Sequence, residues 1–126
     1  MQQLIDRVSA AAGIEPDTAR KAVATILGFL QKNGDPDAVG RILDAVPGAR
    51  EAAAGAAAEE GGGGFLGGLM GGGGLMGLAN QLSGLGLSMD QMQTAGRELF
   101  AFARDHAGED AVGAVAGSIP GLQQFV

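Results

Sequence analysis

An internal duplication sets the strongest limit on how this chain can fold. A shift of 73 residues aligns residues 13–48 with residues 86–121 without a gap, and ten of the 36 aligned pairs are identical. The identical pairs include the run Asp-Ala-Val-Gly at 37–40 and 110–113, and the Pro-Gly pair that closes each copy. Self-similarity at a fixed spacing is typical of repeated units that bury their apolar faces against each other. We therefore expect two copies of one unit in a single domain over 1–126.

Helical spacing and helix-end signals divide the first copy into three helices. Between residues 19 and 30 the apolar residues recur three and four positions apart, which is the pattern of one helix face. Pro16 suits a first helical turn, and Asn33-Gly34 suits a helix end. We expect helices over 2–12, from Pro16 to Asn33, and from Asp35-Pro36 to a stop at Pro47. The Ala-rich residues 49–60 are expected to add a fourth helix.

The second copy repeats the same three helices. Its first helix is expected over 75–85, and its second begins after Ser88, where Gln91 stands at capping-box spacing. The two copies together predict an all-α bundle of about six to seven helices with pseudo-two-fold symmetry. In this division repeat 1 covers 2–60, a Gly-rich apolar insert covers 61–77, and repeat 2 covers 75–126.

Phe29 and Phe102 occupy matching positions at the edge of the apolar stripe of their helices. Such a position allows each ring to reach beyond its own unit. One hypothesis is that the two rings meet across the pseudo-two-fold axis. The alternative is that each ring seals its own helical hairpin.

The insert joins large apolar side chains to a glycine backbone. Eleven of the seventeen residues from 61 to 77 are glycine, and the chain carries no charge between Glu60 and Asp90. Flexible linkers combine glycine with polar residues, so this segment is not an ordinary linker. Its apolar side chains either tuck onto the helical body, mediate association, or insert into a membrane. Phosphate binding is not expected, because no strand precedes the glycines and no Lys-Ser/Thr pair follows them.

Composition excludes several function classes. The net charge of −6 leaves no basic stripe for nucleic acid, and the absence of cysteine removes disulfides, thiolate metal sites and cysteine nucleophiles. His106, next to Asp105, is interpreted as a helix-end residue, because its match in the first copy is Asn33. The acidic pairs near 35–37 and 109–110 are interpreted as helix N-terminal residues. We expect no catalytic, metal or cofactor-binding residues, no cofactor and no enzymatic activity.

The first fourteen residues contain charged side chains and no continuous apolar run, so no signal peptide is predicted. A cytoplasmic location is expected. The periplasm is the alternative for a chain whose leader has been removed.

The Gly-[Ile/Leu]-x-x-Asp start at residues 13 and 86, the [Val/Ile]-Pro-Gly stop and the Gly/Leu/Met-rich insert resemble the bacterial VcgC/VcgE family of small proteins of unknown function. The resemblance covers about residues 4–121. It implies an all-α fold, and it implies no catalytic residue at any position of this chain.

These observations favour a non-catalytic interaction module that forms a homo-oligomer or binds a protein partner. Nucleic acid is not an expected partner. The alternative function is a peripheral membrane or lipid-binding protein that uses the same apolar segment. The expected interaction residues are Phe65, Leu66, Leu69, Met70, Leu75 and Met76.

Overall fold

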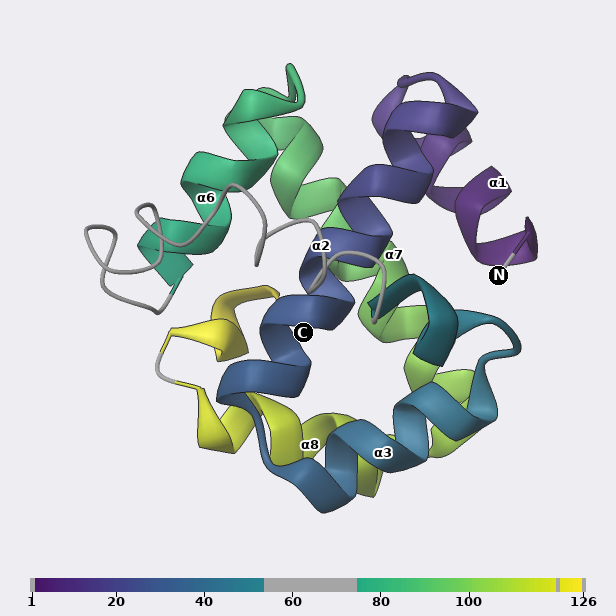
Figure 1. Ribbon diagram of the computed structural model, residues 1–126, viewed down its shortest axis with the longest axis vertical. Coiled ribbons are helices and arrows are strands. Elements are labelled where there is room, and N and C mark those ends of the chain that lie inside the picture. Colours follow the sequence, from purple (N-terminus) through teal and green to yellow (C-terminus); the bar gives the residue numbers. More distant parts are fainter. Residues whose placement is uncertain (1, 54–74, 120, 126) are drawn as a thin grey trace.

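The computed structural model describes residues 2–53, 75–119 and 121–125. Every regular element in these residues is a helix, so the predicted all-α class is confirmed (Figure 1). In chain order the elements are α1 Gln2–Ala12, α2 Pro16–Asn33, α3 Pro36–Ala45, α6 Leu75–Gly84, α7 Met89–Ala107, α8 Glu109–Ser118 and the 3-10 helix η1 Leu122–Phe125. Residues 49–53 are also helical. The rest of the fourth helix expected over 49–60 lies outside the described residues.

Prolines and acidic caps set the helix ends in the first half of the chain. Pro16 occupies the first turn of α2, where its missing N–H removes no helical hydrogen bond. The Asp35 carboxylate caps α3 by accepting a hydrogen bond from the Asp37 N–H at 3.1 Å. Helix α3 ends at Ala45, just before Pro47, because the residue preceding a proline is displaced from the α region.

Helix α7 begins with the predicted capping box. The Gln91 N–H donates to Ser88 Oγ at 3.2 Å, and the Ser88 N–H donates to the Gln91 side-chain oxygen at 2.9 Å. The Gln91 amide nitrogen also donates to the carbonyl oxygen of Ala12 at 3.3 Å. The start of α7 is therefore both capped and joined to the C-terminal end of α1.

Replacing Ser88 by alanine removes the acceptor for the Gln91 N–H. We expect this change to lower the free energy of unfolding by about 1 kcal/mol, the usual effect of losing a serine cap. The matched control is Glu15→Ala, because Glu15 precedes α2 without a side-chain cap bond. That control is expected to stay within about 0.5 kcal/mol of the native chain. Urea denaturation measures both, and equal losses for the two variants would contradict the capping assignment.

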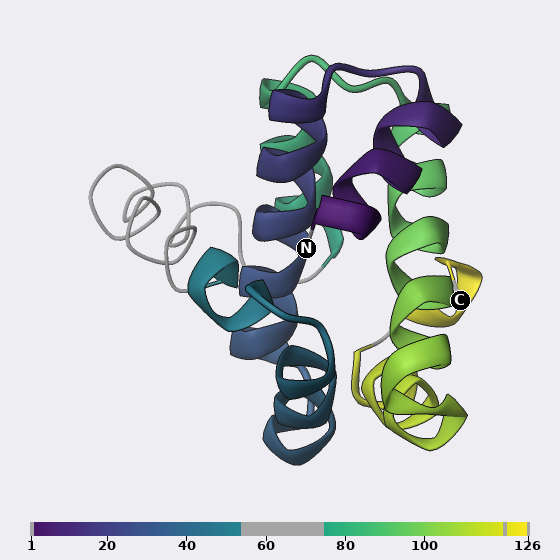
Figure 2. The same cartoon turned by 90° about the vertical axis from the view of Figure 1, so that its right-hand side faces the viewer.

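The two longest helices, α2 and α7, form the centre of the molecule, and α1 lies across them (Figure 2). Helix α3 packs against α8, while α6 packs against α2 and α7. Elements of each half therefore contact elements of the other, and neither half closes its apolar surface alone. The helices follow the same order in the two halves. The pseudo-two-fold relation between the halves stays a prediction.

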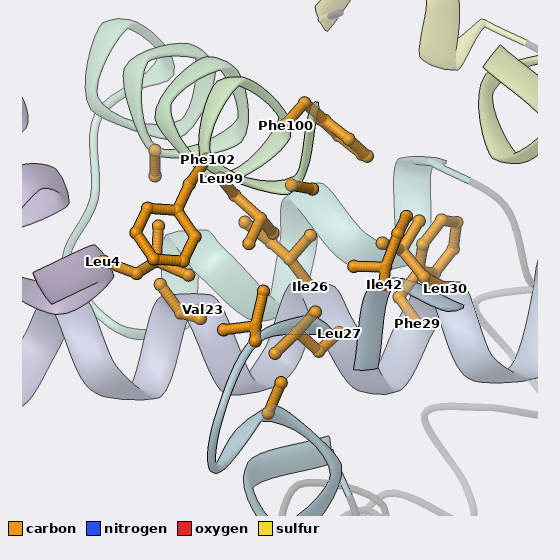
Figure 3. Packing of buried hydrophobic residues seen from close by; sticks show 14 of the residues in the cluster. Leu4, Val23, Ile26, Leu27, Phe29, Leu30, Ile42, Leu99, Phe100 and Phe102 are labelled. Carbon is orange, nitrogen blue, oxygen red and sulfur yellow. The ribbon is translucent and has the colours of Figure 1, made fainter. Parts of the chain in front are cut away.

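One continuous hydrophobic core joins all the described helices (Figure 3). No polar or charged residue is buried among the described residues. The core is aliphatic for the most part, as the composition predicts. Its largest fully buried side chains are Phe100, Leu4, Leu27, Leu30, Ile42, Leu99 and Leu122.

The hypothesis that Phe29 and Phe102 meet between the halves is wrong. Both rings are buried, but they lie at opposite ends of the labelled cluster, with Ile26 and Leu27 between them (Figure 3). Phe102 instead contacts the first helix of the chain. The Arg7 guanidinium lies over the Phe102 ring, 5.7 Å from its centroid. The reason is that α1 crosses α7 and covers the face that carries Phe102.

Arg7 also joins α1 to α7 through charge. Its guanidinium lies 3.3 Å from the Glu98 carboxylate and 3.9 Å from that of Asp105. The ring of His106 stands beside Phe102, with 4.2 Å between the ring centroids. His106 thus belongs to a packing cluster in the last turn of α7, which agrees with its interpretation as a helix-end residue.

Candidate functional site

Four of the six expected interaction residues, Phe65, Leu66, Leu69 and Met70, lie outside the described residues. The other two, Leu75 and Met76, are the first residues of α6. The described part of the apolar segment therefore belongs to α6. This helix packs against both α2 and α7.

An apolar pocket lies beside α6. It has a volume of about 70 Å³ and is partly open to solvent. Helices α6 and α7 form most of its wall, and α2 and η1 complete it. The lining residues are Ile26, Leu78, Ala79, Leu82, Met89, Met92, Gln93, Gly96, Phe100 and Leu122.

Local sequence explains why these side chains converge. In α6, Leu78 and Leu82 are one helical turn apart and both are buried, so they share one face. In α7 the lining residues recur three and four positions apart from Met89 to Phe100, which again defines one face. The capping box at Ser88 fixes the first residue of α7. That start places Met89 at the pocket.

The chemistry of the pocket wall is nearly uniform. Hydrocarbon and thioether groups dominate it, Gln93 is its one polar side chain, and none of the lining residues is charged. General acid–base chemistry needs a titratable group within hydrogen-bond reach of the substrate, and this wall supplies none. A wall of this kind binds an apolar group. Because it offers almost no polar contacts, only its shape orients that group.

The size of the pocket also limits its occupant. Sites for drug-sized molecules and cofactors enclose roughly 300–1,000 Å³, whereas this pocket encloses about 70 Å³. Such a volume suits the end of one apolar side chain. Methionine and leucine side chains fit irregular apolar pockets of this size well, and methionine adapts to them most easily.

The acidic pairs singled out in the sequence lie at helix starts. Asp35 and Asp37 form the cap and first turn of α3, and Glu109 and Asp110 lie in the first turn of α8. In the part of the chain that the structure describes, no three His, Cys, Asp or Glu side chains are placed to hold a metal ion. Among the described helices, none combines the length and the hydropathy that crossing a bilayer requires.

The sequence indicates the apolar segment, but it does not indicate the pocket or the part that Met89 plays in it. Among the residues whose exposure the structure describes, Met89 is the one large hydrophobic residue that is exposed, with 67 % of its surface accessible. A signal was present, because the uncharged stretch continues past the insert through α6 and up to Met89. The convergence of α6, α7, α2 and η1 is a tertiary property, and the helix pattern alone does not contain it.

Comparison of the chain with protein-family models, with curated proteins and with solved structures gives no match. The resemblance to VcgC/VcgE proteins therefore stays a prediction.

Proposed function

We propose that the chain is a non-catalytic interaction module that self-associates or binds a protein partner through its apolar, uncharged segment. The observation that carries this proposal is the continuity of that segment with the pocket. The residues from 61 to 89 carry no charge, and their last part, α6 and Met89, contributes to the pocket wall. The proposed contact residues are Phe65, Leu66, Leu69, Met70, Leu75 and Met76.

The distribution of charge supports an apolar contact. Helix α6 contains no acidic or basic residue in its first or last turn, and the chain as a whole has a net charge of −6. Charged surface residues keep acidic proteins apart in solution. The uncharged helix α6, beside the apolar pocket, is therefore the part of the surface where another protein approaches at the lowest electrostatic cost.

The adaptable side chains of the segment support protein association as well. Leu69 and Met70 are separated from Leu75 and Met76 by glycines only. Glycine allows close backbone approach, and methionine fits varied apolar surfaces. This combination is suited to protein contacts in which side chains adjust to the partner.

The double substitution Leu69→Ser and Met70→Ser tests the proposal. Removing two apolar side chains from the contact is expected to shift the native chain from an assembly larger than a monomer to a monomer, because each buried side chain contributes about 1.5–3 kcal/mol. Multi-angle light scattering after size exclusion measures the mass directly.

The matched control is Gln3→Ser with Ala10→Ser, which introduces the same residue type at two exposed positions of α1, outside the segment, and leaves both apolar side chains in place. It is expected to keep the native mass. A native chain that is monomeric before and after the Leu69 and Met70 substitutions contradicts the proposal. Flotation of the chain with neutral lipid vesicles would favour the membrane-binding alternative instead.

A further inference from the structure

Three features of the pocket face lie close together. Met89 is exposed and stands at the pocket, the pocket accepts the end of one apolar side chain, and helix α7 carries an acid and a base beside the lining residues. An exposed apolar side chain next to an apolar pocket forms a self-complementary patch, because the side chain of one copy fits the pocket of a second copy. Self-complementary patches are what a two-fold dimer interface requires.

Two charged residues of α7, about a quarter turn around the helix from the pocket-lining residues, are also complementary under a two-fold operation. Asp90 and Arg97 are both exposed and are seven residues apart on α7, which places them two turns apart on the same side of the helix. The midpoint between them falls beside Gln93, at the centre of the α7 residues that line the pocket. Neither residue forms an ion pair with another described residue.

Two α7 helices that cross antiparallel at Gln93 bring Asp90 of each opposite Arg97 of the other. Asp90 and Arg97 lie at nearly equal distances from Gln93 along the helix. The contact is therefore reciprocal, and the two ion pairs form together. The same crossing carries Met89 of each copy toward the pocket of the other. Apolar insertion and charge pairing are thus satisfied by one arrangement.

We infer that the partner is a second copy of this chain, docked on the face made by α6 and α7, with Met89 seated in the opposite pocket and Asp90 paired with Arg97 across the interface. This inference rests on the proposed function and names its partner and surface. Within this face, helix α6 lies apart from α1 and α3 in the fold (Figure 1).

Charge reversal provides a test that leaves the core untouched, since both residues are exposed. In Asp90→Arg each dimer would place two arginines opposite each other at both contacts, and in Arg97→Asp it would place two aspartates. Each single variant is expected to weaken dimerisation at least about tenfold. Mixing the two variants in equal amounts restores both opposite-charge contacts, so a one-to-one heterodimer is expected near native affinity.

Sedimentation velocity on each variant and on the mixture measures this outcome. The charge-matched control is Arg41→Asp on α3, which makes the same change of charge at an exposed site outside the face and is expected to dimerise like the native chain. High salt should reduce the difference between the single variants and the native chain, because screening weakens exposed charge contacts. Met89→Ser is expected to weaken the dimer about tenfold or more, because each copy loses a buried apolar side chain.

Three results would overturn the inference. They are single charge variants that dimerise like the native chain, a mixture that stays monomeric, and a native monomer whose pocket is filled by its own insert. The failure of this inference is separable from that of the proposed function. If the Leu69 and Met70 substitutions abolish association while Asp90→Arg leaves it intact, the module associates through its insert and the docking face is wrong.

Discussion

Replacing Phe100 by alanine is expected to lower the free energy of unfolding by about 3–5 kcal/mol. Phe100 is 1 % exposed and is the first of the largest fully buried side chains of the chain. Its ring contributes to the wall of the pocket, so truncation both removes buried apolar surface and joins a new cavity to an existing one. The loss lies at the upper end of single core substitutions because the helices around the ring cannot all collapse into the space.

Urea denaturation at a fixed protein concentration measures this loss, since association makes apparent stability depend on concentration. Phe100→Leu is the matched control. Leu27 occupies the corresponding position of the first half and is fully buried there, so leucine is a side chain that this fold already packs. The leucine variant is expected to lose clearly less stability than the alanine variant. A loss below about 1 kcal/mol for Phe100→Ala would contradict the place of this ring in the core.

Replacing Gly34 by alanine is expected to destabilise the fold by about 1–3 kcal/mol. A Cβ atom at this position would lie 2.8 Å from the carbonyl oxygen of Leu30 and 2.9 Å from Cγ2 of Val39. The carbonyl belongs to the helix backbone and accepts the Gly34 N–H at 2.7 Å, so it has little room to move. The turn is also held from outside, because the Asp35 N–H donates to Ser118 Oγ at 3.0 Å.

Gly40→Ala is the control, and it is expected to change stability in the opposite direction. Gly40 lies within α3, and a Cβ atom there meets nothing within 4 Å. Alanine at such a helical site stabilises by about 0.4–1 kcal/mol, because glycine loses more backbone freedom on folding. Thermal unfolding of the two variants shows directly whether each substitution raises or lowers the stability. Equal effects at the two positions would contradict the close packing of the turn between α2 and α3.

Helix limits were predictable from the sequence because they depend on residues a few positions apart. Pro16, the Asp35-Pro36 pair and the Ser88 capping box each act through neighbouring backbone groups. These signals act between residues a few positions apart, so they do not depend on how the helices pack together.

Side-chain partners were less predictable because they depend on which helices cross. The position of Phe102 on its helix was evident, but the crossing of α1 over α7 decides that Arg7 lies on the ring. Gly34 reads as a helix-end glycine, and its matching residue is Ala107. Only the neighbouring Val39 and Leu30 atoms show that the site lacks room for a Cβ atom. The pocket could not be predicted for the same reason, because four separate elements form it.

Self-association of the unaltered chain is visible in its mass in solution. Sedimentation equilibrium over a wide range of concentrations measures that mass without any substitution. The mass is expected to rise from the 12.5 kDa of one chain to twice that value as the concentration increases. A mass that stays at 12.5 kDa across the whole range would contradict self-association and the docking face together.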